Sequence, residues 1–64
     1  MFVIHAVSRG KVVGYVCNLD SDSLVLCDSK QSADKFTTED EVQGAIDECT
    51  SILDNFVYGY EEVG

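Results

Sequence analysis

The strongest constraint on the fold is a single stretch of helical periodicity in the second half of this 64-residue chain. Thr38 and Glu41 fit a capping box, in which the Thr38 hydroxyl accepts from the Glu41 N–H and the Glu41 carboxylate reaches back to the Thr38 N–H. Three acids in the first turn favour the positive end of the helix dipole. Apolar residues then recur at helical spacing on one face: Val42, Ala45, Ile46, Cys49, Ile52, Leu53 and Phe56. The pattern predicts one amphipathic helix over residues 38–56.

Three β-rich runs precede this helix, and they predict strands at about residues 2–8, 11–17 and 23–28. Gly10 can adopt the positive φ that a tight hairpin turn requires. The fold class we expect is α+β: a three-stranded antiparallel β-meander packed against one C-terminal helix. Residues 57–64 would form either a short strand or a loose tail. The whole chain, 1–64, is expected to be one small domain.

Both faces of the predicted sheet are apolar. A two-residue turn at Arg9-Gly10 would pair Val7 with Val12, Ile4 with Tyr15, and Phe2 with Cys17. One helix can cover only one face, so the other needs either the tail or a second chain, because an exposed apolar patch commonly marks an association site. The uncovered face would contain Val3, His5, Val7, Val12, Val16 and Val25. It predicts a homodimer, although a β-bulge would change this set of residues.

The charges are segregated along the chain. No Lys or Arg follows Lys35, and the eight acids after it account for the formal net charge of -8. This argues against direct binding of nucleic acid, which needs Lys and Arg to displace counterions from phosphates. On the predicted helix, one exposed side carries five acids and a glycine, here called the acidic ridge: Asp40, Glu41, Gly44, Asp47, Glu48 and Asp54.

Two interpretations of the acidic ridge remain open. It is either a solvated face that keeps a small protein in solution or a docking surface for a basic region of a partner protein. In the second case its carboxylates could occupy a nucleic-acid channel where phosphates would otherwise sit.

The sequence contains no pattern typical of catalysis or cofactor binding. His5 is the only histidine, and the three cysteines (Cys17, Cys27 and Cys49) are dispersed without a CxxC spacing. We therefore expect no enzyme, no catalytic residue, no cofactor and no metal site. No apolar run approaches the roughly 20 residues of a membrane span, and we expect no secretion signal, because the first residues lack a basic region followed by a hydrophobic stretch. The expectation is a cytoplasmic protein with no membrane partner, in the host cytoplasm if it is viral.

In size, acidity and lack of proline, the chain resembles the small proteins that bacteriophages encode to inhibit host enzymes or defence systems. This resemblance rests on no motif and assigns no residue a role. Two functional hypotheses follow from the surfaces. The first is a small acidic module that binds and inhibits or modulates a larger host protein through the acidic ridge. The second is a structural or assembly module that forms a homodimer through its apolar sheet face, with no inhibitory role.

Overall fold

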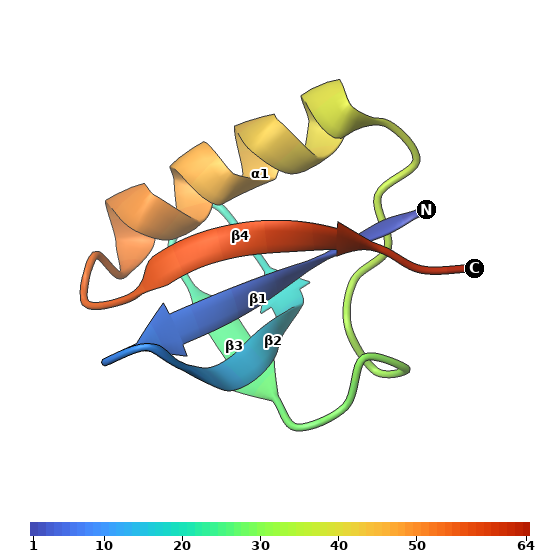
Figure 1. Cartoon of the computed structure of the whole chain (residues 1–64). Helices are drawn as coiled ribbons and strands as arrows, with labels where there is room; N and C mark the ends of the chain where they lie inside the picture. The colour runs from blue at the N-terminus through green and yellow to red at the C-terminus, as the bar shows by residue number, and fades with distance from the viewer.

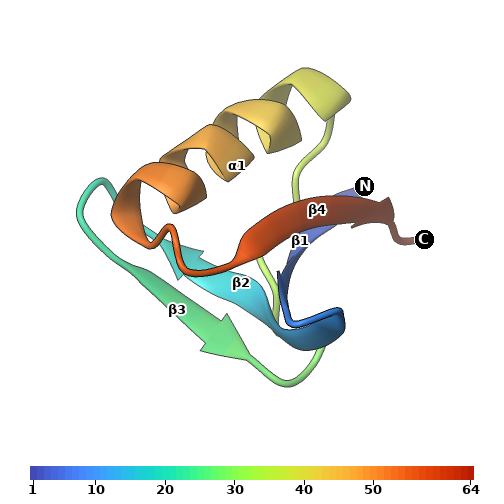
Figure 2. The ribbon, with the colours of Figure 1, turned by 60° about the vertical axis from the view of Figure 1, so that its left-hand side comes forward.

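The computed structural model describes all 64 residues and has a four-stranded antiparallel sheet with one helix on one of its faces (Figures 1 and 2). The elements, in chain order, are β1 (Phe2–Ser8), β2 (Lys11–Leu19), β3 (Leu24–Cys27), α1 (Glu39–Ile52) and β4 (Val57–Glu62). The strand order is β3-β2-β1-β4, so β1 is paired on both sides. The predicted α+β class is confirmed, and the tail forms the fourth strand.

The turn between β1 and β2 is tight. Arg9 and Gly10 both have positive φ, 55° and 78°, as the two central residues of a type I′ hairpin turn require. This turn gives the Val7–Val12 pairing that the sequence predicts.

A β-bulge then shifts the register of this hairpin. Val7 pairs with Val12 but Ala6 pairs with Gly14, which leaves Val13 as an extra residue on β2. Beyond the bulge His5 lies opposite Tyr15, so the expected Ile4–Tyr15 pairing is wrong. An extra residue reverses which side chains of a strand face the core. Val16 therefore lies on the helix side of the sheet.

The expected pairing of Phe2 with Cys17 is also wrong, because another segment pairs with the start of β1. Phe2 and Phe36 exchange two backbone hydrogen bonds, with N···O distances of 2.8 and 2.9 Å. The Asp34 N–H donates to the Val16 carbonyl oxygen on β2 at 3.0 Å. The segment around residues 34–36 thus satisfies backbone groups at both strands, and the neighbouring Ala33 is buried.

The core lies between α1 and the sheet. Its centre is formed by five buried residues: Ile4, Val16, Val42, Ala45 and Cys49. Aromatic side chains from both ends of the chain pack around this cluster, and the rings of Phe2 and Tyr60 meet edge to face at 5.6 Å. Burial raises the pKa of the Cys49 thiol to about 11. The core thus joins the first strand, the helix and the last strand.

The helix begins as predicted, with one difference at its cap. The Glu41 N–H donates to the Thr38 hydroxyl at 3.2 Å, as the capping box requires. The Glu41 carboxylate, however, accepts from the N–H and hydroxyl of Thr37 at 3.4 and 3.2 Å. The predicted return bond to the Thr38 N–H is therefore replaced by bonds to the preceding residue.

The helix ends at Ile52, four residues before the predicted end at Phe56. The hydroxyls of Thr50 and Ser51 donate to the carbonyl oxygens of Ile46 and Asp47, and such bonds weaken a helix. The last turn contains no basic residue, and the carboxylate of Asp54 would lie at the negative end of the helix dipole. These features explain why the apolar spacing alone overestimates the helix length.

Candidate interaction surfaces

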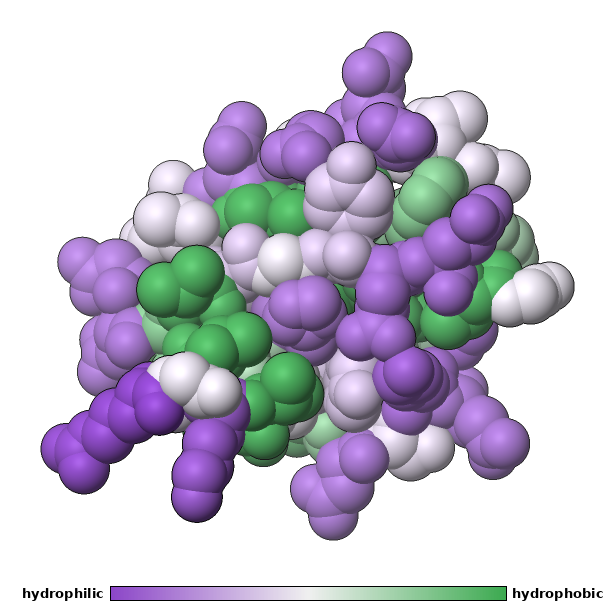
Figure 3. Space-filling model, in the orientation of Figure 1, coloured by the Kyte–Doolittle hydropathy of each residue, from purple (hydrophilic) through white to green (hydrophobic).

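The acidic ridge is exposed over most of α1. Asp40, Asp47 and Glu48 are all exposed, and no ion pair of the structure involves any of them. Hydrophilic side chains project from the helix side of the molecule in Figure 3. Seven residues advance a helix by about 10.5 Å and nearly two turns, which places Asp40 and Asp47 in one row. Three carboxylates thus face solvent without a compensating cation.

Two residues assigned to the ridge lie differently. Glu41 is exposed, but its carboxylate is engaged by Thr37 at the N-terminal cap. Asp54 follows Leu53, the C-cap residue, and is therefore outside the helix. The prediction that Asp54 belongs to the helical part of the acidic ridge is therefore wrong, because the helix ends before that residue.

Gly44 is the one member of the ridge without a side chain. It is exposed in the middle of α1, and a Cβ built on it meets no atom within 4 Å. Packing within the monomer therefore gives no reason for a glycine here, although glycine costs a helix about 1 kcal/mol relative to alanine. The position leaves room for close approach of another backbone.

None of the four Lys and Arg side chains forms an ion pair with a residue of α1. Lys30 forms an ion pair with Glu61 at 2.6 Å. The Lys35 ammonium donates to the carbonyl oxygens of three residues in its own segment: Lys30, Gln31 and Ala33. Arg9 and Lys11 flank the glycine of the β1–β2 turn. The electrostatic field around α1 is consequently set by its acids.

The second predicted surface, the apolar sheet face, is smaller than the sequence suggests. Val16 belongs to the core under α1, so the prediction that it faces outward is wrong, and the bulge at Val13 is the reason. Val3 is also completely buried. His5 and Val7 are half-buried, whereas Val12 and Val25 are about half exposed. Four of the six assigned residues therefore retain exposed surface.

An exposed apolar row remains at the hairpin end of the sheet. Val7 pairs with Val12 on one side and with Val57 on the other. Val57 is 72% exposed and Val12 53%, and Figure 3 shows hydrophobic side chains gathered near the start of β4. We call Val7, Val12 and Val57 the valine row. The sequence did not identify Val57, because the pairing of the tail with β1 has no local signal.

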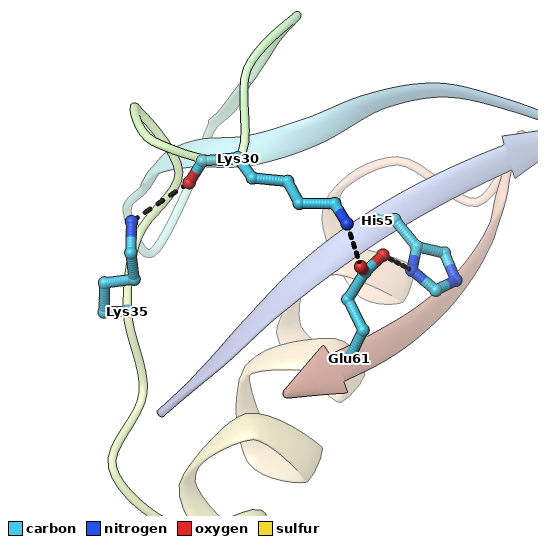
Figure 4. Close-up of polar contacts among 4 residues, drawn as sticks. All are labelled: His5, Lys30, Lys35 and Glu61. Atoms are coloured by element: carbon cyan, nitrogen blue, oxygen red, sulfur yellow. Dashed lines mark hydrogen bonds and ion pairs between the residues drawn. The ribbon is translucent and has the colours of Figure 1, made fainter. Parts of the chain in front are cut away.

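A polar cluster occupies the same sheet face farther along the strands (Figure 4). The Glu61 carboxylate contacts the His5 Nδ1 atom at 3.0 Å and the Lys30 ammonium at 2.6 Å. The Lys30 ammonium lowers the pKa of Glu61, with a smaller contribution from His5, and Glu61 in turn raises the pKa of Lys30. The cluster links β1, β4 and the segment after β3. Sequence reasoning missed it, because it depends on the His5–Gly59 and Val3–Glu61 pairings of β1 with β4.

Gly59 makes room for the imidazole in this cluster. A Cβ at Gly59 would lie 2.6 Å from His5 Nε2, closer than atoms can approach without movement. The glycine is therefore explained by its cross-strand partner, unlike Gly44.

The structure contains no pocket and no group of three or more potential metal ligands among His, Cys, Asp and Glu side chains. Its only helix is too short and too polar to cross a membrane. The chain matches no protein-family model, and comparisons with curated proteins and with solved structures gave no match either.

Proposed function

We propose that this protein is a small acidic binding module that inhibits or modulates a larger host protein. Its acidic ridge docks on a basic surface of that partner, such as a surface that otherwise binds nucleic acid. The observation that supports the proposal is the row of exposed carboxylates on α1 that no cation of the chain compensates.

In the isolated protein, no ion pair involves the carboxylates of Asp40, Asp47 and Glu48. Asp40 and Asp47 lie about 10.5 Å apart along the helix, so they repel each other only weakly. In the isolated protein only solvent and salt screen them, over a Debye length of about 8 Å at physiological ionic strength. A basic partner surface would replace this screening with direct pairing and would also accelerate encounter. Gly44, in the middle of the ridge, would let the partner approach the helix backbone.

The test compares two variants of equal net charge. The ridge variant carries Asp40→Asn, Asp47→Asn and Glu48→Gln. The control variant carries Asp20→Asn, Asp22→Asn and Asp28→Asn, three exposed acids that lie outside α1, in the β2–β3 loop and just after β3. Wild-type protein is immobilised to capture its partner from lysate of the source organism, and the affinity of the captured protein is then measured for all three forms.

We expect the ridge variant to bind at least about tenfold more weakly at low salt and with a shallower salt dependence. The control variant should bind nearly as tightly as the wild type. If the ridge variant binds as tightly as the wild type, the ridge is only a solvated face. Equal losses in both variants would show that net charge, rather than the ridge, determines binding.

The exposed valine row favours a second candidate function, an assembly module that forms a homodimer through this end of the sheet. Light scattering at high protein concentration tests this, with Val12→Lys and Val57→Lys expected to give monomers. Assembly through valines should change little with salt, which distinguishes it from docking through the ridge. A wild-type monomer at high concentration would exclude the homodimer.

A further inference from the structure

Two of the three cysteines lie on neighbouring strands of the sheet. Cys27, at the end of β3, is opposite Tyr15 of β2. Cys17 follows two residues later on β2 and falls at an irregularity of the ladder, where Val16 and Asn18 have partners on β3 and Cys17 has none. Both cysteines are half-buried, whereas Cys49 is completely buried under the helix.

The thiols reach toward each other's strand. The Cys17 thiol donates to the Val25 carbonyl oxygen of β3 at 3.4 Å. The Cys27 sulfur lies 3.4 Å from the Tyr15 carbonyl oxygen of β2 and 3.4 Å from the Ser29 carbonyl oxygen of its own segment. Both sulfur atoms therefore lie over the gap between β2 and β3. The Cys27 thiol is the main cause that raises the pKa of Cys17, in agreement with this placement of the two side chains on neighbouring strands.

We propose that Cys17 and Cys27 form a dithiol site, which low-molecular-weight disulfides convert into an intramolecular disulfide. One cysteine thiolate attacks the small disulfide, forms a mixed disulfide and releases one small thiolate. The second cysteine thiolate then attacks the protein sulfur of that mixed disulfide and releases the second small thiolate. The protein loses two electrons, the small disulfide gains them, and the two thiol protons end on the released small thiols.

The new bond would join β3 covalently to β2. β3 has only four residues and is an edge strand, so it has few bonds that resist local opening. The disulfide would therefore slow hydrogen exchange of the β3 amides, and a reductant would reverse the effect. The site is independent of the acidic ridge and of the valine row.

The experiment uses oxidised glutathione on the folded protein, followed by alkylation of free thiols in denaturant, trypsin digestion and mass spectrometry. Cleavage after Lys11 and Lys30 leaves Cys17 and Cys27 in one peptide, residues 12–30, while Cys49 falls in the peptide that follows Lys35. We expect peptide 12–30 to lose two hydrogen atoms and to carry no glutathione. Cys49 should be recovered as the alkylated thiol.

Two controls make the result specific. Cys17→Ser and Cys27→Ser should each carry one glutathione on the remaining cysteine and show no change in β3 hydrogen exchange. The wild-type chain unfolded in urea should close the bond more slowly than the folded protein. Three results would each overturn the proposal. They are two glutathiones on the wild-type peptide, a peptide that stays reduced, and equal rates of disulfide formation in the folded and unfolded chains.

Discussion

Gly59 and Gly44 have opposite structural settings, although both are glycines within regular elements. A methyl group on Gly59 would overlap the His5 imidazole, whereas a methyl group on Gly44 would point into open space. The first glycine is required by a cross-strand neighbour. The second carries only the intrinsic cost of glycine in a helix.

Substitution of these two glycines by alanine should therefore have opposite effects on stability. Gly59→Ala should lower the free energy of unfolding by about 1–3 kcal/mol, as overpacking does, while Gly44→Ala should raise it by about 1 kcal/mol. Urea denaturation followed by circular dichroism measures both. In a His5→Ala background, the same Gly59→Ala change should cost much less, because the imidazole is absent. An equal cost of Gly59→Ala in both backgrounds would show that the contact with His5 is not the cause.

Glu61 predicts a pH dependence. Its pKa is held below the ordinary value of 4.5, chiefly by the Lys30 ammonium and then by His5. Because the folded-state pKa is depressed, the contribution of Glu61 to stability is present above pH 4.5 and is lost as pH falls through the folded-state pKa. The stability advantage of wild type over Glu61→Gln should thus shrink below pH 4.5.

At alkaline pH, the stability contributed by the Lys30–Glu61 ion pair changes with pH in the opposite direction. The pKa of Lys30 is raised above 10.5, mainly by its hydrogen bond to Glu61. Its contribution is therefore present below pH 10.5 and is lost as pH rises through the folded-state pKa. The urea midpoints of wild type and Glu61→Gln, measured across the pH range, test both effects. A difference between them that stays constant at both extremes would show that the ion pair does not contribute.

At the level of single elements, the β1–β2 hairpin contains one unfavourable residue. Arg9 has a φ of 55°, a conformation that costs most residues about 1 kcal/mol but that asparagine tolerates well. Arg9→Asn should therefore raise the free energy of unfolding by about 1 kcal/mol. Arg9→Lys keeps the charge and a side chain that is unbranched at Cβ, so it should leave the free energy of unfolding unchanged. Equal urea midpoints for Arg9→Asn and wild type would contradict this explanation.

The elements also show which parts of the fold can be predicted from sequence. The start of α1 and its buried face at Val42, Ala45 and Cys49 are predictable, because capping and helical spacing are local signals. The bulge at Val13 is only partly predictable, because the neighbouring Gly14 is compatible with either a bulge or the close approach of another strand. The Phe2–Phe36 bridge is unpredictable, since it joins segments far apart in the chain.

The same distinction applies to the candidate surfaces. The exposed acids of α1 follow from local periodicity, and the structure places Asp40, Asp47 and Glu48 where the sequence does. The valine row and the cluster around Glu61 both require the pairing of β4 with β1. A sheet face can be assigned only when the register is known, and one extra residue in β2 moved Val16 into the core.

For the molecule as a whole, the concentration of acids on α1 predicts a stability that depends on salt. The double variant Asp47→Asn, Glu48→Gln should be as stable as wild type or more stable at low salt, because it removes two carboxylates from a strongly negative molecule and keeps Asp40, whose charge is favourable at the positive end of the helix dipole. The difference should narrow as salt rises, because screening reduces the repulsion in wild type. Thermal unfolding at low and high ionic strength measures it. A loss of stability at low salt would indicate that these carboxylates make favourable contacts within the monomer.

Because of the strand order, the sheet depends on the last strand of the chain. β1 is the first strand of the chain and is paired from Phe2 to Val7 with β4, the last. A chain cut before Val57 would leave one side of β1 without hydrogen-bond partners, from Phe2 to Val7. An unpaired strand edge of this kind recruits strands from other chains. Fragments that lack β4 should therefore aggregate instead of forming a smaller stable fold. The sheet is complete only when β4 has paired with β1.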